Sequence, residues 1–425
     1  MIGSIHLTAF DAAAILIVLA ALLSYVSHRF VPLPQSAGLT VMGMLASLIV
    51  IALDRILPGS TISGDIVRFI AGIDFHKTLM EGMLSFLLFA GALHVDWGAM
   101  RRGRWPILLL STVGVMLSTV LVGGGFYLLA HLLGIAVPLP WCLVFGALIS
   151  PTDPIAVMDV LRRTSVDETL QATVAGESLF NDGVGVVIFS ILLAIAAGGA
   201  KFTAGEATAL FFEEAGGGVL LGLALGWVGY RGMRSIDEYK VEVLISLAIV
   251  MGGYALAGWI HVSGPVAMAV AGLIVGNAGV AHAMSEVTQD QLMKFWGLID
   301  EILNSVLFLL IGLEVVAIPQ DLRIVVAGLA AIPLVLAVRA TSVLIPLAVM
   351  RPWLSLGKIA PPVLIWGGLR GGISVALALS LPQGSERSAI LAATYIVVLF
   401  AVIVQGGSIA WIIKRLQTGA HRWVG

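Results

Sequence analysis

Long apolar runs fill almost the whole chain and are separated only by short charged or proline-containing stretches. Of the 425 residues, 59% are hydrophobic and only 11% are charged, whereas soluble domains carry about 25% charged residues. One soluble core cannot bury so much apolar surface, so we expect most of the surface to face lipid. Because a spanning helix needs about 20 apolar residues, the runs predict an all-α polytopic membrane protein with about thirteen transmembrane helices.

The expected helices begin and end at charged or proline-containing punctuation. The first is expected to be retained, because no Lys or Arg precedes Arg29 and no small-residue cleavage site follows the apolar run. The ranges are 9–27, 36–53, 78–95, 106–131, 139–160, 168–199, 207–230, 241–260, 263–281, 297–318, 323–350, 359–381 and 388–413.

The basic residues are divided unequally between the two sets of loops. Loops after odd-numbered helices, with the C-terminal tail, hold 15 Lys and Arg residues, and the opposite loops hold six. Under the positive-inside rule this bias predicts a cytoplasmic C-terminus and an N-terminus outside. The remaining two basic residues, Arg339 and Arg370, fall inside expected helices.

Ionisable residues inside the expected helices are functional candidates, because a charge near the bilayer centre is costly. The clear cases are Asp153, Glu177, Asp182, Arg339 and Arg370. Six further acids lie nearer to expected helix ends, where we expect solvation or structural pairing. They are Glu81, Asp96, Asp159, Asp300, Glu301 and Glu314.

The segment Ser150-Pro151-Thr152-Asp153-Pro154 predicts an opening in the fifth helix. Its two prolines remove two backbone donors and leave carbonyls without partners. Such carbonyls at membrane depth are oxygen ligands for a small cation where they line a cavity. Asp153 can alternatively cap the half-helix that follows, and both roles use the same geometry.

The next helix carries a polar stripe. Ser178 and Asp182 stack on one face, and Glu177 and Asn181 stack on the adjoining one. If the stripe only joins helices, its two acids need basic partners, for which Arg339 and Arg370 are the intramembrane candidates. Otherwise Thr152, Asp153, Ser178 and Asp182 offer the oxygen ligands that hard cations prefer.

Cofactor binding, nucleic-acid binding and a disulfide are not indicated. The eight histidines are scattered, and the single cysteine, Cys142, lies in an apolar run where a buried hydrophobe is expected. The net charge is -2, and no basic cluster is longer than Arg101, Arg102 and Arg104.

A second interruption, Gly367-Gly368-Leu369-Arg370-Gly371-Gly372, lies in the twelfth helix, seven helices after the first. Paired interruptions in two halves indicate inverted repeats with a site near the midplane. Like ends of the broken helices then face each other, where Asp153 and Arg370 can neutralise the helix dipoles. Close helix packing is the alternative role of the glycines.

Four segments in order resemble the monovalent cation:proton antiporter 1 family, which includes NhaP-type sodium/proton antiporters and sodium/hydrogen exchangers. They are Ser150–Pro154, Gly176–Asp182, Asn304–Glu314 and Gly368–Gly372. The resemblance implies an antiporter fold with two crossed discontinuous helices. It also implies a homodimer, with a core (roughly 78–199 and 297–413) that moves against a dimerisation region (roughly 9–53 and 207–281).

The resemblance implies a role for each matching residue. Asp182 binds cation and proton in turn, helped by Ser178, by Thr152 through its backbone and by Asp153. Asn181 marks the Asn-Asp subclass, which is associated with electroneutral one-for-one exchange. Glu177 pairs with Arg339 in the core, and Arg370 matches the arginine of the second broken helix.

One departure concerns Phe89-Ala90-Gly91, where many relatives carry an acid. Ala90 cannot ligate an ion, so the choice between sodium, lithium and potassium stays open. Glu81, nine residues away, lies about 13 Å along a helix and cannot substitute directly.

The expected function is therefore exchange of a monovalent cation for a proton by alternating access, with no cofactor, in a prokaryotic inner membrane. A cation channel and an intramembrane aspartyl-type enzyme are the alternatives. A channel usually needs a continuous pore. Ser178 lacks the following glycine of a nucleophile elbow, and the Gly-x-Gly-Asp sequence of intramembrane aspartyl proteases is absent, so we expect no enzyme activity.

Overall fold

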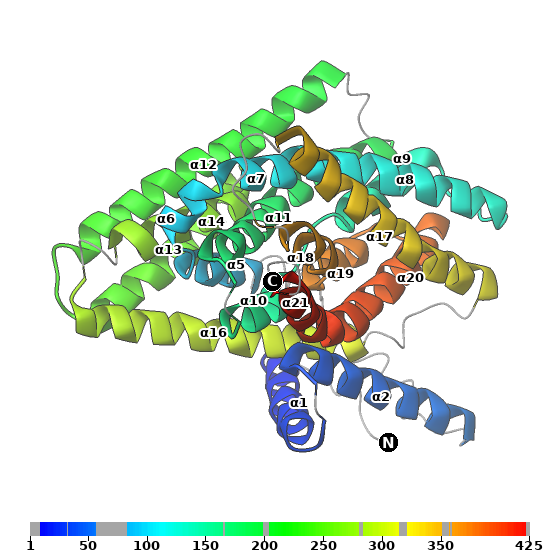
Figure 1. The fold of residues 1–425 in the computed structure, drawn as a ribbon, viewed down its shortest axis with the longest axis horizontal. Coiled ribbons are helices and arrows are strands. Elements are labelled where there is room, and N and C mark those ends of the chain that lie inside the picture. The colour runs from blue at the N-terminus through cyan, green and yellow to red at the C-terminus, as the bar shows by residue number, and fades with distance from the viewer. Residues whose placement is uncertain are drawn as a thin grey trace.

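The structure is a computed structural model that describes residues 9–31, 33–56, 83–164, 166–198, 204–279, 284–313, 321–350, 357 and 359–421. Helices dominate these ranges (Figure 1), and one isolated β-bridge joins Asp153 to Leu369. The α-helices are α1 (Ala9–Phe30), α2 (Gln35–Ile56), α5 (Leu84–Leu93), α6 (Trp97–Arg102), α7 (Arg104–Leu109), α8 (Val115–Leu132), α9 (Leu139–Leu148), α10 (Ile155–Arg162), α11 (Glu168–Ala196), α12 (Ala204–Met233), α13 (Tyr239–Trp259), α14 (Gly264–Ile274), α16 (Glu286–Leu313), α17 (Leu322–Met350), α18 (Ala360–Trp366), α19 (Gly372–Leu379), α20 (Ser385–Phe400) and α21 (Gly406–His421). Within the same described ranges there are three π-helical turns. Leu110–Gly114 connects α7 to α8, Val275–Gly279 extends α14, and Ala401–Gln405 connects α20 to α21.

Much of this helical content is long and apolar enough for a bilayer. Among the described residues, eight helical segments meet that requirement: Ala13–Phe30, Arg104–Leu132, Glu168–Ala196, Gly205–Met233, Tyr239–Trp259, Glu286–Leu313, Leu322–Met350 and Ser385–Gln417. Shorter apolar helices cover Gln35–Val50, Leu84–Leu93, Leu139–Leu148 and Gly264–Gly279. The predicted all-helical polytopic class is confirmed at this level.

Helix α16 begins earlier than the sequence predicts. The expected start was residue 297, but the helix begins at Glu286. Its first turns are amphipathic: Asp290 and Lys294 form an exposed ion pair of 2.6 Å, while Trp296 is fully buried. Charges on the outer face lower the local hydropathy, so the apolar run starts later than the helix. As a result, Asp300 lies in the middle of α16 and not at its end.

The two predicted interruptions are present. The expected helix 139–160 is divided into α9 and α10, and the expected helix 359–381 is divided into α18 and α19. Their non-helical segments meet where the Asp153 N–H donates to the Leu369 carbonyl over 2.8 Å. The breaks therefore contact each other directly, although they are more than 200 residues apart in sequence.

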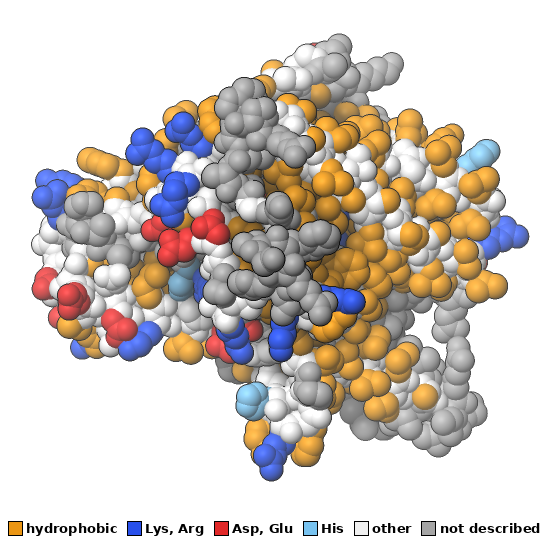
Figure 2. Space-filling model, viewed as in Figure 1, with side chains coloured by type: hydrophobic (Ala, Val, Ile, Leu, Met, Phe, Trp, Pro, Cys, Tyr) orange, Lys and Arg blue, Asp and Glu red, His pale blue; other side chains and the backbone are white. Residues whose placement is uncertain are grey.

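The helices form two groups around α11 (Figure 1). Helices α12 and α13 pack on α14 in one group, and α17 packs on α20 in the other. Helix α11 contacts both α14 and α9, and α16 packs on α2 and α5. In Figure 2, hydrophobic side chains dominate the surface around α8 and α17, whereas most charged side chains in view lie elsewhere. Cys142 is fully buried, as expected for a small core residue.

Candidate functional site

The crossing of the two broken helices sets the geometry of the site. Helix α9 ends at Leu148 and α10 begins at Ile155, while α18 ends at Trp366 and α19 begins at Gly372. Pro151 and Pro154 have no N–H group, so the carbonyls that such donors would have satisfied are released from the helical pattern. Polar backbone is thereby presented inside a helical protein.

Asp153 lies beside the N-terminal ends of two half-helices. Its Oδ1 accepts a hydrogen bond of 2.9 Å from the Ile155 N–H at the start of α10. A Cβ atom added to Gly371, just before α19, would lie 2.6 Å from Asp153 Oδ2. Helix N-termini carry a partial positive charge, which a carboxylate stabilises. Both sequence-based roles of Asp153, as a cap and as an acid at the break, are therefore compatible with its position.

Arg370 lies against the carbonyls that follow α9. Its Nη1 donates to the Ser150 carbonyl and, over 3.1 Å, to the Pro151 carbonyl. The side chain is fully buried. A guanidinium at this position balances the partial negative charge at a helix C-terminus. The structure thus brings Arg370 to the break that contains Asp153. Arg370 lies at the C-terminal end of α9, whereas Asp153 lies at the N-terminal end of α10.

The polar stripe of α11 binds the opened backbone. The Asn181 amide donates from Nδ2 to Thr152 Oγ1 over 2.8 Å and accepts at Oδ1 from the Thr152 N–H over 3.2 Å. Ser178 Oγ donates to the Thr152 carbonyl. One turn beyond Ser178, the Asp182 side chain is buried, and its Oδ1 has no hydrogen-bond partner in the described part of the chain.

Glu177 faces Arg339 and is not grouped with Ser178 and Asp182, the candidate ion ligands of the stripe. The two side chains form a two-pronged ion pair, with Nη1–Oε1 and Nη2–Oε2 distances of 2.5 and 2.9 Å. Arg339 also donates to the Leu364 carbonyl from Nε and Nη2, over 3.1 and 2.8 Å. A Cβ atom on Gly368 would collide with the guanidinium. This buried pair therefore ties α11 to α17 and to the end of α18.

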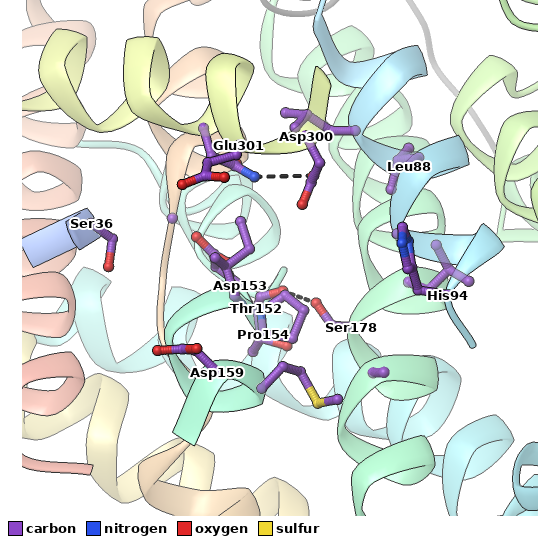
Figure 3. Close-up of a pocket in the computed structure, with 18 of the residues that line it drawn as sticks. Ser36, Leu88, His94, Thr152, Asp153, Pro154, Asp159, Ser178, Asp300 and Glu301 are labelled. Carbon is purple, nitrogen blue, oxygen red and sulfur yellow. Dashed lines mark hydrogen bonds between the residues drawn. The ribbon is translucent and has the colours of Figure 1, made fainter. Parts of the chain in front are cut away.

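A cavity of about 1170 Å³ leads to the crossing (Figure 3). Its inner part is lined by the half-buried Asp153 and by three buried residues, Thr152, Ser178 and Asp182. Its solvent end is marked by the charged side chains of Arg102, Arg163, Asp159 and Glu168, which are 56%, 77%, 57% and 84% exposed. The cavity therefore connects the candidate ion ligands to one side of the protein, the side of the arginine-rich loops.

Sequence reasoning did not predict the residues of one wall of this cavity. Asp300, expected to be a helix-end acid, points from α16 into the cavity (Figure 3). Asn304 and Ser374 also line it, and neither was singled out. The i, i+4 spacing of Asp300 and Asn304 on an apolar helix was the available signal.

The other expected helix-end acids have varied positions. Asp96 caps α6 by accepting from the Ala99 N–H over 2.6 Å, and Asp159 forms an ion pair with Arg163 over 2.9 Å. Glu301 is exposed and lines the cavity (Figure 3). Glu81 and Glu314 lie outside the described residues.

Two further positions bear on the sequence analysis. Ala90 is fully buried in α5, and its neighbour Gly91 lines the cavity instead. Glu242 of α13, which sequence reasoning did not single out, is also fully buried, and its carboxylate has no partner among the described residues. Its position in the first turn of α13 sets it apart from the cavity.

A multi-pass helical membrane protein with two broken helices that meet at their breaks, and with a buried carboxylate in the inner part of a cavity, has the architecture of an ion transporter. The chain belongs to the family described as "Sodium/hydrogen exchanger, transmembrane", whose model matches residues 15–415. It is a member of a transporter family, not an enzyme.

Similar proteins support this assignment. The chain is 46% identical over 413 residues to the Na(+)/H(+) antiporter NhaP of Pseudomonas aeruginosa, covering 96% of this chain and 97% of that protein. It is 35% identical to the Na(+)/H(+) antiporter NhaH of Halobacillus aidingensis, covering 80% and 84% of the two chains. The fold matches the sodium proton antiporter MjNhaP1 of Methanocaldococcus jannaschii with a TM-score of 0.73, at 19% identity, over 96% of this chain and 99% of that one.

Proposed function

We propose that this chain exchanges sodium for protons across a membrane, and that both ions bind at Asp182. One observation carries the assignment of the residue: a buried carboxylate oxygen that has no hydrogen-bond partner among the described residues belongs to a side chain in the inner part of a cavity, beside opened backbone. A carboxylate in this position needs either a proton or a cation to offset the cost of its burial. The similar proteins named above are Na(+)/H(+) antiporters, so sodium and protons are the expected ions.

Competition for one carboxylate gives the coupling. In this scheme the cation is held by Asp182, by the Ser178 hydroxyl and by the Thr152 carbonyl, with Asp153 adding charge nearby. These are the hard oxygen ligands that a small monovalent cation prefers. Binding a proton at Asp182 displaces the cation, and only the two occupied forms cross. In either form Asp182 binds one monovalent cation, a sodium ion or a proton, so each cycle exchanges one positive charge for another and is electroneutral.

The arrangement of the cavity supports an inward-open state. Its solvent end is lined by Arg102, Arg162 and Arg163, which lie at or next to helix ends that the positive-inside rule assigns to the cytoplasm. We therefore place the C-terminus in the cytoplasm, the N-terminus outside and the protein in a prokaryotic inner membrane, with about thirteen spans.

Alternating access then requires movement between two regions. The crossed helices belong to the proposed core, roughly 78–199 and 297–413, which forms inverted repeats. The remaining region, roughly 9–53 and 207–281, is the proposed dimerisation surface of a homodimer. Movement of the core exposes Asp182 to each side in turn.

Flux against a gradient tests the function. In proteoliposomes containing the purified chain, an outward sodium gradient should drive protons inward against their own gradient. Clamping the voltage with potassium and valinomycin should leave the rate nearly unchanged. Purely downhill ion movement would indicate a channel and overturn the proposal, and a strong voltage dependence would overturn the one-for-one stoichiometry.

A further inference from the structure

Three residues that line the same cavity each have a buried polar atom without a hydrogen-bond partner in the described part of the chain. These atoms are Oδ1 of Asp182, Oδ1 of Asn304 and Oγ of Ser374, whose side chains belong to residues that are 7%, 6% and 1% exposed. Leaving one such group unpaired is unfavourable, so most buried polar groups have a partner. Asp182 belongs to the exchange site already proposed. The other two atoms lie on α16 and α19 and have no role in that site.

The orientation of the Asn304 amide is fixed by its neighbour. Its Nδ2 donates to Asp300 Oδ1 over 3.0 Å. An ionised carboxylate only accepts hydrogen bonds, so the amide nitrogen must face Asp300. The amide oxygen consequently faces away from Asp300. Because Asn304 and Asp300 both line the cavity, this pair combines a neutral oxygen ligand with an adjacent negative charge.

Helix packing brings Ser374 to the same wall. Helices α16 and α19 are in contact, and a Cβ atom added to Gly372 would collide with the Leu307 side chain of α16. Leu307, Gly371, Gly372 and Ser374 all line the cavity. Gly371 in turn lies against Asp153. The wall formed by α16 and α19 is therefore continuous with the crossing, but it is distinct from the α11 stripe that carries Ser178 and Asp182.

We propose that Asn304 and Ser374, with the charge of Asp300, form a second cation-binding station, which takes sodium from the cavity and passes it to Asp182. The inference rests on the proposed function. Carbonyl and hydroxyl oxygens with one carboxylate suit a hard monovalent cation. A station built mainly from neutral oxygens binds weakly, and passage through a protein requires that an ion can leave each site it enters.

The test separates cation affinity from turnover in proteoliposomes. Asn304→Leu has a similar size but no oxygen, and it should raise the KM for sodium about tenfold, which corresponds to about 1.4 kcal/mol. Its kcat should stay within about twofold, since Asp182 and its α11 neighbours are untouched. Ser374→Ala should raise the KM in the same direction. Asn304→Asp restores an oxygen, so its KM should be no higher than that of the wild type.

Controls separate a ligand role from a packing role. Ser190→Ala removes an exposed hydroxyl of α11 outside the cavity and should leave KM unchanged. If Asn304→Leu does not elute as a folded protein, Ser374→Ala and Asn304→Asp decide the result. An unchanged sodium KM in Asn304→Leu or, in its place, in Ser374→Ala overturns the station. So does an increase in Asn304→Asp as large as that in Asn304→Leu. If the station is overturned but the wild-type protein still exchanges sodium for protons, the proposed function stands. If the wild-type protein shows no exchange, both the station and the proposed function are overturned.

Discussion

Asn181 and Thr152 exchange two hydrogen bonds across 29 residues of sequence, one in each direction. Together with the Ser178 hydroxyl, this amide holds the opened backbone of the first break against α11. The donor and acceptor of one Asn side chain are both used, which neither an aspartate nor a leucine can reproduce. Asn181 therefore fixes the position of the Thr152 carbonyl, a proposed ion ligand.

We expect the Asn181–Thr152 contact to be energetically coupled. Asn181→Ala removes both bonds, and Thr152→Val removes the hydroxyl acceptor, so each change should lower the free energy of unfolding by about 1–3 kcal/mol. In the double variant the loss should be smaller than the sum, by about 0.5 kcal/mol or more. Unfolding of the purified protein in detergent measures this cycle. Strictly additive losses would contradict the coupling.

The Glu177–Arg339 pair should be structural. Removing one partner leaves the other as an uncompensated buried charge, so Glu177→Gln and Arg339→Met should each destabilise the protein by about 3–5 kcal/mol. A double Glu177→Met, Arg339→Met variant should recover part of that loss, because neither charge is left buried. Thermal unfolding in detergent is the measurement. A double variant less stable than both single variants would show that the two charges do not act as a pair.

Gly371 should be required for the position of Asp153. A Cβ atom there would approach Asp153 Oδ2 to 2.6 Å and Asp153 Cβ to 2.7 Å. Since the Asp153 backbone is fixed by its hydrogen bond to Leu369, Gly371→Ala should displace the carboxylate and reduce sodium-driven proton movement about tenfold or more, the factor that corresponds to about 1.4 kcal/mol.

Gly252→Ala is the matched control for this change. Gly252 lies in α13, and a Cβ atom there would have no neighbour within 4 Å, so transport should match the wild type. If Gly371→Ala transports at the wild-type rate, Asp153 does not need its observed position.

The sequence predicted the helical class, both breaks and the residues that meet at them because these depend on local chemistry. Apolar runs locate the helices, and Pro151, Pro154 and the glycines around Arg370 interrupt them. Elimination left Arg339 and Arg370 as candidate partners for the buried acids, and the resemblance to the antiporter family implied the pairing of Glu177 with Arg339. The helical class and the two breaks need no knowledge of the packing of distant helices.

Other features depend on tertiary structure and could not be read from hydropathy. The start of α16 was missed because charges on its exposed face hide the helix. Ser374 was missed because a single polar residue in an apolar run has no distinguishing period. Asn304 was missed although its i, i+4 spacing from Asp300 was visible, because Asp300 was expected to lie at a helix end. Asn304 and Ser374 both line a common cavity and have polar atoms without hydrogen-bond partners in the ranges that the structure describes, which only the packing of α16 against α19 reveals.

Sodium-driven proton movement by Asp182→Asn in proteoliposomes tests the central claim most directly. Asparagine keeps the size of the side chain but carries neither a negative charge nor an exchangeable site for a proton in the physiological range. Asp290→Asn, which neutralises an exposed acid of α16, is the control and should transport like the wild type. We predict that Asp182→Asn is folded and gives no exchange above empty liposomes. Exchange at a rate comparable to the control would contradict the assignment of Asp182 as the shared binding site of cation and proton.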